Sequence, residues 1–206
     1  RWVQARIKKY YGRDSFLLHP FLNSDLFSGG HGEKGSYYLV VSAFAPYKRI
    51  DLAIQACERL GRKLVVIGSG QDEKKLLTIA GPHTTFLGGA SLETLQEMYA
   101  GAKALIFPGQ EDFGIVPLES MASGTPVIAY GQGGATDTVV PEKTGLFIQE
   151  QTVESLCEAI LEFESIKVDW KELCLLQANQ FTKKTFQDKF TKFVGSAWKS
   201  HHSQAK

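Results

Sequence analysis

Two glutamates, Glu111 and Glu119, are the side chains of this sequence best placed to do chemistry. The apolar run 104–107 is followed by a Pro-Gly pair, which predicts a buried parallel strand that feeds a loop. Pro117 suits the first position of a helix, and a glycine closes the pattern, so we expect a helix over 117–123. Glu111 would then lie in the loop beyond the strand, and Glu119 in the first helical turn, near the positive end of the helix dipole.

The same helix start could hold an anion. If Pro117 is the first helical residue, the capping position falls on Val116, whose side chain has no oxygen to accept the free backbone N–H groups. A phosphate would satisfy those donors. The plainer alternative is that both glutamates are solvated and that Glu119 only stabilises the dipole.

Two cations, Lys48 and Arg49, stand where the next helix should begin. Cations oppose the dipole at that end of a helix, so their position makes sense if an anion lies between them. Asp51 could instead pair with one of the two, and this alternative stays open.

Glycine-rich loops follow two further predicted strands, at 68–70 and at 131–134. Each could let the backbone approach a ligand, or could simply make a tight turn. Cations, glycine loops and carboxylates nevertheless all fall at one edge of the predicted sheet. Because cations and N–H groups neutralise phosphates while carboxylates accept hydrogen bonds from hydroxyls, this convergence indicates a sugar diphosphate ligand.

Alternating strand and helix patterns must position these residues. They predict an α/β fold, a doubly wound, Rossmann-like parallel sheet with C-terminal helices, in which ligands bind beyond the carboxyl ends of the strands. The predicted strands are 37–42, 63–67, 84–87, 104–107, 126–130 and 146–148, and the predicted helices are 49–60, 71–80, 92–100, 117–123, 153–163 and 170–198, the last interrupted near 181–182.

Composition narrows the classes of function. With 206 residues, 43% hydrophobic content and a net charge of +1, the chain can bury a large core and carries no general nucleic-acid footprint. Its three cysteines lack paired metal-ligand spacing and should be buried, reduced thiols. No run approaches the ~20 apolar residues that cross a bilayer, and no basic n-region followed by an apolar h-region opens the sequence, so we expect a cytoplasmic protein.

The ends of the chain suggest its organisation. Residues 1–11 form an amphipathic helical pattern, 16–18 a brief strand, and 29–35 a glycine-rich connector. We therefore expect a helix and linker over 1–36, one ligand-binding domain over 37–198, and a flexible tail over 199–206.

The run from 109 to 129 resembles the E-x7-E motif of retaining glycosyltransferases with the GT-B fold. The resemblance extends to 41–52, 66–70 and 86–88, and to Gly133-Gly134 followed by 144–147, and it covers roughly residues 14–193. The chain is similar to the C-terminal, donor-binding half of the GT-B fold in a family that includes bacterial mannosyltransferases.

This resemblance implies roles for particular residues. Glu111 would lie by the donor sugar and Glu119 would bind the ribose of the nucleotide, while Lys48 would contact the diphosphate. Glu111 and Lys48 are the expected catalytic residues. The remaining expected donor-binding residues are Arg49, Gly68, Leu87, Gly88, Phe113, Gly114, Ile115 and Val116.

The sequence departs from the family pattern in two ways. Many members have an arginine where this chain has Ala43, and Arg49 could supply the second cation instead. The family also needs an N-terminal domain that binds the acceptor, and the segment before Tyr37 is too short to build one. Residues 1–11 resemble the last helix of that domain, although a basic amphipathic helix could also contact a membrane surface.

The resemblance implies transfer of a hexose from a nucleotide sugar, with GDP-mannose favoured and a UDP-sugar also open, to a glycan or lipid-linked acceptor. It implies no metal, in keeping with the lack of an Asp-x-Asp motif, no other cofactor and no nucleic acid. The full enzyme could contact the inner membrane surface peripherally. Alternatives are a glucosyl or N-acetylglucosaminyl transferase, a sugar-nucleotide epimerase of the same fold, or a nucleotide-binding module without turnover.

Overall fold

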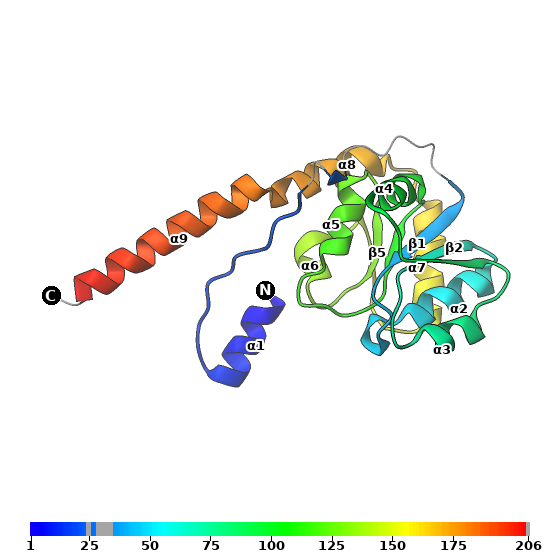
Figure 1. The fold of residues 1–206 in the computed structure, drawn as a ribbon, viewed down its shortest axis with the longest axis horizontal. Helices are drawn as coiled ribbons and strands as arrows, with labels where there is room; N and C mark the ends of the chain where they lie inside the picture. The colour runs from blue at the N-terminus through cyan, green and yellow to red at the C-terminus, as the bar shows by residue number, and fades with distance from the viewer. Residues whose placement is uncertain (24–25, 28–34, 205–206) are drawn as a thin grey trace.

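The computed structural model describes residues 1–23, 26–27 and 35–204 (Figure 1). The glycine-rich connector predicted over 29–35 lies, apart from Gly35, outside the described residues.

Six parallel strands form one sheet in the order β3-β2-β1-β4-β5-β6. Their sequences are short and apolar, and β4 is buried along its whole length, as expected for strands covered on both faces. The doubly wound, Rossmann-like prediction is confirmed. The strands are β1 Tyr37–Val41, β2 Lys63–Ile67, β3 Thr84–Gly88, β4 Leu105–Phe107, β5 Val127–Tyr130 and β6 Gly145–Ile148.

Helices cover both faces of the sheet (Figure 1). One face carries α2 Ile50–Leu60, α3 Glu73–Ile79 and α7 Val153–Ser165, and the other carries α4 Leu92–Gly101, α5 Ile115–Ala122, α6 Ala135–Thr138 and α8 Trp170–Ala178. The predicted limits agree with these within two residues. In the described part of the chain, the four-residue α-helix α6 and the 3-10 helix η2 Pro46–Lys48 lie where no helix was predicted.

The sheet order creates a topological switch point between β1 and β4. From β1 the chain proceeds outward through β2 and β3, and then returns to place β4 on the other side of β1. Loops that leave two such strands diverge to opposite sides, which opens a crevice at the carboxyl edge. The loops after β1 and β4 carry the two cations and Glu111, respectively.

The N-terminal segment and the C-terminal helix lie on the same side of the sheet domain, and the linker contacts that helix (Figure 1). Helix α1 Trp2–Tyr11 ends at Gly12, whose φ of 64° terminates it as predicted. The 3-10 turn η3 Asn179–Phe181 separates α8 from α9 Lys183–Gln204, which projects from the domain in Figure 1. The helix includes residues 199–204, which the sequence had assigned to a flexible tail.

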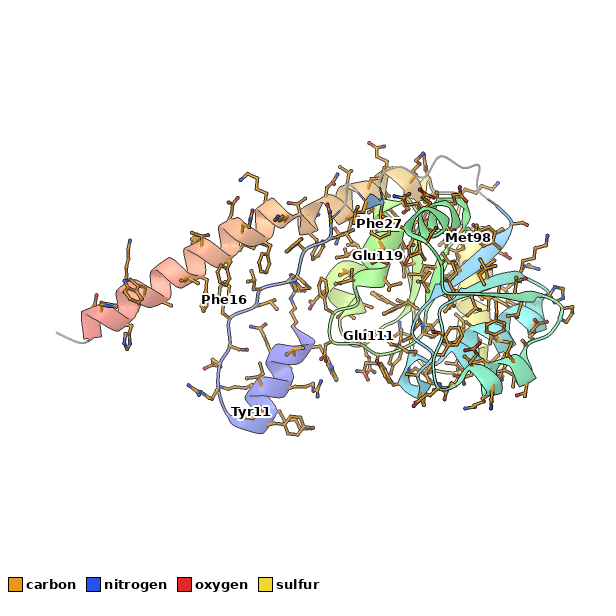
Figure 2. The ribbon with its side chains drawn as sticks, in the orientation of Figure 1. Tyr11, Phe16, Phe27, Met98, Glu111 and Glu119 are labelled. Atoms are coloured by element: carbon orange, nitrogen blue, oxygen red, sulfur yellow. The ribbon has the colours of Figure 1, made fainter. Side chains whose placement is uncertain are left out.

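The brief strand predicted at 16–18 is wrong. This segment is an extended linker, and its side chains pack on α9 rather than pairing with the sheet. The Phe16 ring, labelled in Figure 2, stacks on Phe193 with centroids 4.1 Å apart. The Phe21 ring contacts Phe186 with centroids 5.3 Å apart. Apolar contact with a helix therefore accounts for the pattern that resembled a strand.

The prediction of buried, reduced cysteines is confirmed. Cys57, Cys157 and Cys174 are all free thiols within the core. Burial raises the pKa of Cys57 to about 12, so its reactive thiolate form is scarce at neutral pH.

Candidate functional site

The site is centred on an ion pair between Lys48 and Glu111 across the switch point. Lys48 ends the 3-10 turn η2 Pro46–Lys48 after β1, and Glu111 lies in the loop after β4 (Figure 2). Their side chains are 14% and 22% exposed, respectively. The structure thus brings together the two residues expected to be catalytic.

The loops that carry this pair are in direct backbone contact. A Cβ atom on Gly109 would lie 2.8 Å from the Cα of Lys48, so only glycine allows this approach. Gln151 holds the start of the β4 loop from the other side, because its Nε2 donates to the Pro108 carbonyl at 2.8 Å. These contacts set the spacing between the two charged side chains.

Helix α5 begins at Ile115, two residues earlier than predicted, with Gly114 as its cap. The prediction that Val116 caps the helix is therefore wrong. Pro117 is tolerated at the third position because its missing N–H would have no partner there, and Gly114 adopts the φ of 80° that turns the chain into the helix. The first turn has neither a side-chain cap nor an acidic residue, and its N–H groups at Ile115 and Val116 can donate hydrogen bonds to an anion.

Glu119 consequently lies in the second turn of α5, and its predicted first-turn position is also wrong. Its Oε2 accepts a hydrogen bond of 2.7 Å from the hydroxyl of Tyr99, a fully buried residue of α4. Burial raises the pKa of the Glu119 carboxyl, and the hydrogen bond from Tyr99 opposes this in part. Figure 2 places Glu119 on α5, in the neighbourhood of Phe27.

Arg49 is not aimed at Glu111. It has a φ of 52° and lies between η2 and α2, so the helix begins one residue later than predicted. Its Nε and one terminal nitrogen donate to the carboxylate of Asp51, each at 3.2 Å. The structure therefore has the Asp51 pairing that the sequence had left open.

The glycines after β2 and β3 pack the sheet edge together. The N–H of Gly68 donates to the Gly88 carbonyl at 2.8 Å, and a Cβ on Gly68 would lie 1.8 Å from the Ser42 carbonyl oxygen. Gly68 is thus committed to backbone packing. Gly88 has a φ of 68° with open space around it, and the neighbouring Leu87 is 43% exposed.

The glycines after β5 pack against the backbone of the Glu111 loop. The N–H of Gly134 donates to the Glu111 carbonyl at 2.6 Å, and a Cβ on Gly134 would lie 2.1 Å from the Cα of Phe113. The sequence had suggested that these glycines approach a ligand. They instead approach the backbone of the residues around Glu111.

Several residues at the site escaped the sequence analysis. The Phe113 ring contacts His19 from the linker at 5.4 Å and Phe181 from η3 at 5.9 Å between ring centroids. His19 also lies beside Asp137 of α6, and Tyr99 is the partner of Glu119. Of these residues, Asp137 could have been found from the sequence, since it lies three residues after the Gly133-Gly134 pair of a predicted ligand-binding loop. The others could not, because their contacts join segments far apart in the chain.

Two further features concern the described residues as a whole. In the described ranges, no group of three or more His, Cys, Asp or Glu side chains is arranged to hold a metal ion. The helices of residues 1–23, 26–27 and 35–204 include none long and apolar enough to span a bilayer.

Residues 23–184 match the family model described as glycosyl transferases group 1. A D-inositol 3-phosphate glycosyltransferase of Mycobacteroides abscessus is 31% identical in an alignment of length 168 that covers 71% of this chain and 38% of that protein. A GDP-mannose-dependent alpha-(1-6)-phosphatidylinositol monomannoside mannosyltransferase of Mycobacterium tuberculosis is 32% identical in an alignment of length 140 that covers 59% of this chain and 36% of that protein. A glycogen synthase of Pseudomonas aeruginosa is 30% identical in an alignment of length 170 that covers 78% of this chain and 31% of that protein.

Among solved structures, Anabaena Alr3699/HepE in complex with UDP and glucose superposes with a TM-score of 0.81 at 16% identity, covering 94% of this chain and 60% of that one. The fold thus matches that of GT-B glycosyltransferase structures. The chain spans less than two fifths of the length of the curated relatives above. It belongs to the glycosyl transferases group 1 family.

Proposed function

We propose that this chain is the donor-binding half of a retaining glycosyltransferase that transfers mannose from GDP-mannose to a glycan or lipid-linked acceptor. The observation that carries the proposal is the Lys48–Glu111 pair at the switch point. Glu111 precedes Gly114, the N-cap of α5, by three residues, so the pair is close in sequence to an uncapped helix N-terminus. A cation, a carboxylate and the uncapped N–H groups of the first turn of α5 then lie at the same edge of the sheet, and a nucleotide sugar needs all three.

The diphosphate is assigned to Lys48 and to the first turn of α5. As the bond from the sugar to the phosphate oxygen breaks, negative charge develops on the leaving diphosphate. The ammonium of Lys48 and the N–H groups of Ile115 and Val116 stabilise that charge, and they are held in place before the reaction starts. The backbone of Phe113 and Gly114 lines the approach to these donors.

The two glutamates take the sugar and the ribose. Glu111 steadies the donor hexose while the acceptor hydroxyl attacks the anomeric carbon on the face that the diphosphate leaves. Glu119 accepts hydrogen bonds from the ribose hydroxyls through the carboxylate oxygen that Tyr99 does not occupy. Leu87 and Gly88 border the nucleobase.

Arg49 and Gly68 have weaker support. Asp51 already neutralises the guanidinium of Arg49, and the N–H of Gly68 is used by Gly88. Arg49 would have to exchange Asp51 for a phosphate to serve as the second cation in place of the arginine absent at Ala43. Gly68 would contribute to the donor site through its backbone packing against the loop after β1.

The choice of mannose is supported by the mycobacterial relative whose description specifies GDP-mannose and a phosphatidylinositol mannoside. A lipid-linked acceptor of that kind would be met at the inner membrane surface by a cytoplasmic enzyme. The acceptor would bind to a second domain, in keeping with the share of its relatives that the chain spans.

A glucosyl transferase is the second candidate. The glycogen synthase relative and the UDP and glucose of the HepE complex favour it. Titration calorimetry of the 206-residue chain with GDP and with UDP separates the two, because a donor site selects its own base. Markedly tighter GDP binding supports the mannosyl proposal, and tighter UDP binding overturns it in favour of the glucosyl one.

The catalytic assignment has its own test. In the full-length enzyme, Glu111→Ala should lower kcat by about a hundred-fold or more, as expected for the loss of a group that acts on the transferring sugar. Unchanged turnover would refute the role of Glu111.

A further inference from the structure

The position of Glu111 depends on two supports that lie on either side of it. Its carbonyl accepts the 2.6 Å hydrogen bond from Gly134, which leads directly into α6. Two residues further along, the Phe113 ring is enclosed by aromatic neighbours. The Glu111 loop is therefore fixed by α6 on one side and by the Phe113 ring on the other.

His19 contacts both supports. Its ring stacks on Phe113 with centroids 5.4 Å apart and an interplanar angle of 25°. Its Nε2 lies 3.4 Å from Oδ2 of Asp137, an α6 residue whose side chain is only 2% exposed. His19 itself belongs to the linker, far from both segments in the sequence, so it ties three separate pieces of chain together.

The C-terminal segment completes this arrangement. Phe181 of η3 lies 5.7 Å from the His19 ring and 5.9 Å from the Phe113 ring. The three rings form a closed cluster, His19–Phe113–Phe181, that connects the linker and the end of the chain to the loop after β4. Aromatic clusters of this kind restrict the rotamers of their members, because each ring fills space that the others would need in order to move.

The Nε2 atom of His19 lies beside Asp137, but its geometry there does not make a hydrogen bond. Its Nε2, Oδ1 of Asp137 and Oγ of Ser15 are buried without a hydrogen-bond partner among the described residues. Burial also lowers the pKa of His19 despite the nearby Asp137. The neutral ring is thus the favoured form, and its shape rather than its charge makes the connection.

We propose that His19 is a positioning residue for sugar transfer, which holds the Glu111 loop in its working geometry through the Phe113 ring. This inference rests on the proposed role of Glu111, although its structural part concerns this chain alone. A displacement of about 1 Å in a reacting group can cost about a hundred-fold in rate, so a support of this kind has a measurable effect on turnover.

Three variants test the proposal. His19→Ala removes the ring, while His19→Phe keeps a stacking ring and removes the two nitrogen atoms, including the Nε2 that lies beside Asp137. His83→Ala, at the opposite edge of the sheet just before β3, is the matched control.

In the full-length enzyme, we expect His19→Ala to lower kcat by about ten-fold or more with KM changed less than two-fold. His19→Phe should restore kcat to within about three-fold of the wild type, and His83→Ala should leave kcat unchanged. If the kcat of His19→Ala equals that of His83→Ala, or if the kcat of His19→Phe is no higher than that of His19→Ala, the proposal is wrong.

A second readout does not depend on transferase activity. Amide hydrogen exchange of residues 110–114 in the 206-residue chain should accelerate in His19→Ala and return to the wild-type rate in His19→Phe, while exchange in β2 stays unchanged. If the wild-type enzyme transfers no hexose but the exchange pattern holds, the proposed function fails and the structural support stands. Unchanged exchange at 110–114 in His19→Ala would overturn the inference whatever the activity.

Discussion

Lys48 and Glu111 pair with each other across the switch point of the sheet. Each side chain is less than a quarter exposed, so water screens this contact only in part. The cation assigned to the donor diphosphate is therefore already neutralised when no donor is bound. A phosphate that reaches Lys48 must replace a carboxylate that is held beside it.

This competition predicts an uncommon result for a catalytic residue. Glu111→Gln should bind GDP about ten-fold more tightly than the wild type, since the freed ammonium no longer has to leave a carboxylate, and charge-assisted hydrogen bonds contribute roughly 1.5–3 kcal/mol. The same substitution should lower turnover. Titration calorimetry of the isolated chain measures the first effect.

Lys48→Met provides the control for this competition. It should weaken GDP binding, and Glu111→Gln added to Lys48→Met should bring no further gain, because the competing contact is already gone. Equal or weaker GDP binding by the single Glu111→Gln variant would contradict the model of competition.

Glu119 should reduce the stability of the ligand-free protein at neutral pH. Its folded-state pKa is raised by burial, so the folded protein holds this proton more tightly than the unfolded chain does. The contribution of protonated Glu119 to folding stability is fully present below the pKa that this carboxyl has in the unfolded chain. It is lost as the pH rises through the pKa that the carboxyl has in the folded protein. Above that range the ionised carboxylate is buried beside Tyr99 at a net cost.

Glu119→Gln removes this cost and can keep the hydrogen bond from Tyr99. We expect its Tm to rise by about 2–4 °C at pH 7.5, corresponding to about 1 kcal/mol for a chain of this size, and not to rise at pH 4. Glu158→Gln, in the middle of α7 on its exposed side, is the control. Thermal melts at the two pH values check the prediction, and a Glu119→Gln variant that is less stable at pH 7.5 would refute it.

The cysteines should be inert in the native protein. Cys57 and Cys174 are fully buried and Cys157 is 7% exposed, and burial raises the pKa of both Cys57 and Cys157. A thiol reagent at pH 8 should therefore label none of the three within minutes, and all three after unfolding in guanidinium chloride. Rapid labelling of even one equivalent in the native protein would contradict this prediction.

Local patterns predicted the elements of the fold well, because strands such as β4 are short, apolar runs bounded by turn residues. They also placed Lys48 and Glu111 at the same edge of the sheet, since parallel strands share the direction of their carboxyl ends. The start of α5 was misplaced because Pro117 is equally acceptable at the third helical position, and the sequence does not reveal that Gly114 supplies the turn.

Contacts between distant segments could not be predicted in this way. The hydrogen bond from Tyr99 to Glu119 and the stacking of His19 on Phe113 depend on how α4 and the linker pack against α5 and its loop. Periodicity records only which face of an element is apolar, so it leaves the partner of each side chain undetermined. The apolar pattern at 16–18 was misread as a strand for the same reason, because its partner is the helix α9.

Gly134 should affect both the stability of the fold and the position of Glu111, because its backbone packs directly against the Glu111 loop. Its φ of −69° suits any residue, so Gly134→Ala introduces no backbone strain. The added Cβ would lie 2.1 Å from the Cα of Phe113, and that atom belongs to the backbone and cannot rotate away. Alanine must therefore push the Glu111 loop outward and lengthen the hydrogen bond to the Glu111 carbonyl.

We expect Gly134→Ala to destabilise the chain by roughly 1–3 kcal/mol, as overpacking does, and to weaken GDP binding while α2 and α3 keep their native exchange protection. Gly89→Ala, where a Cβ would meet no atom within 4 Å, is the matched control and should change neither quantity. Chemical denaturation and calorimetry on the two variants distinguish the steric effect from the general cost of replacing a glycine. If Gly134→Ala binds GDP as tightly as Gly89→Ala, the backbone contact between α6 and the Glu111 loop is not what positions the donor site.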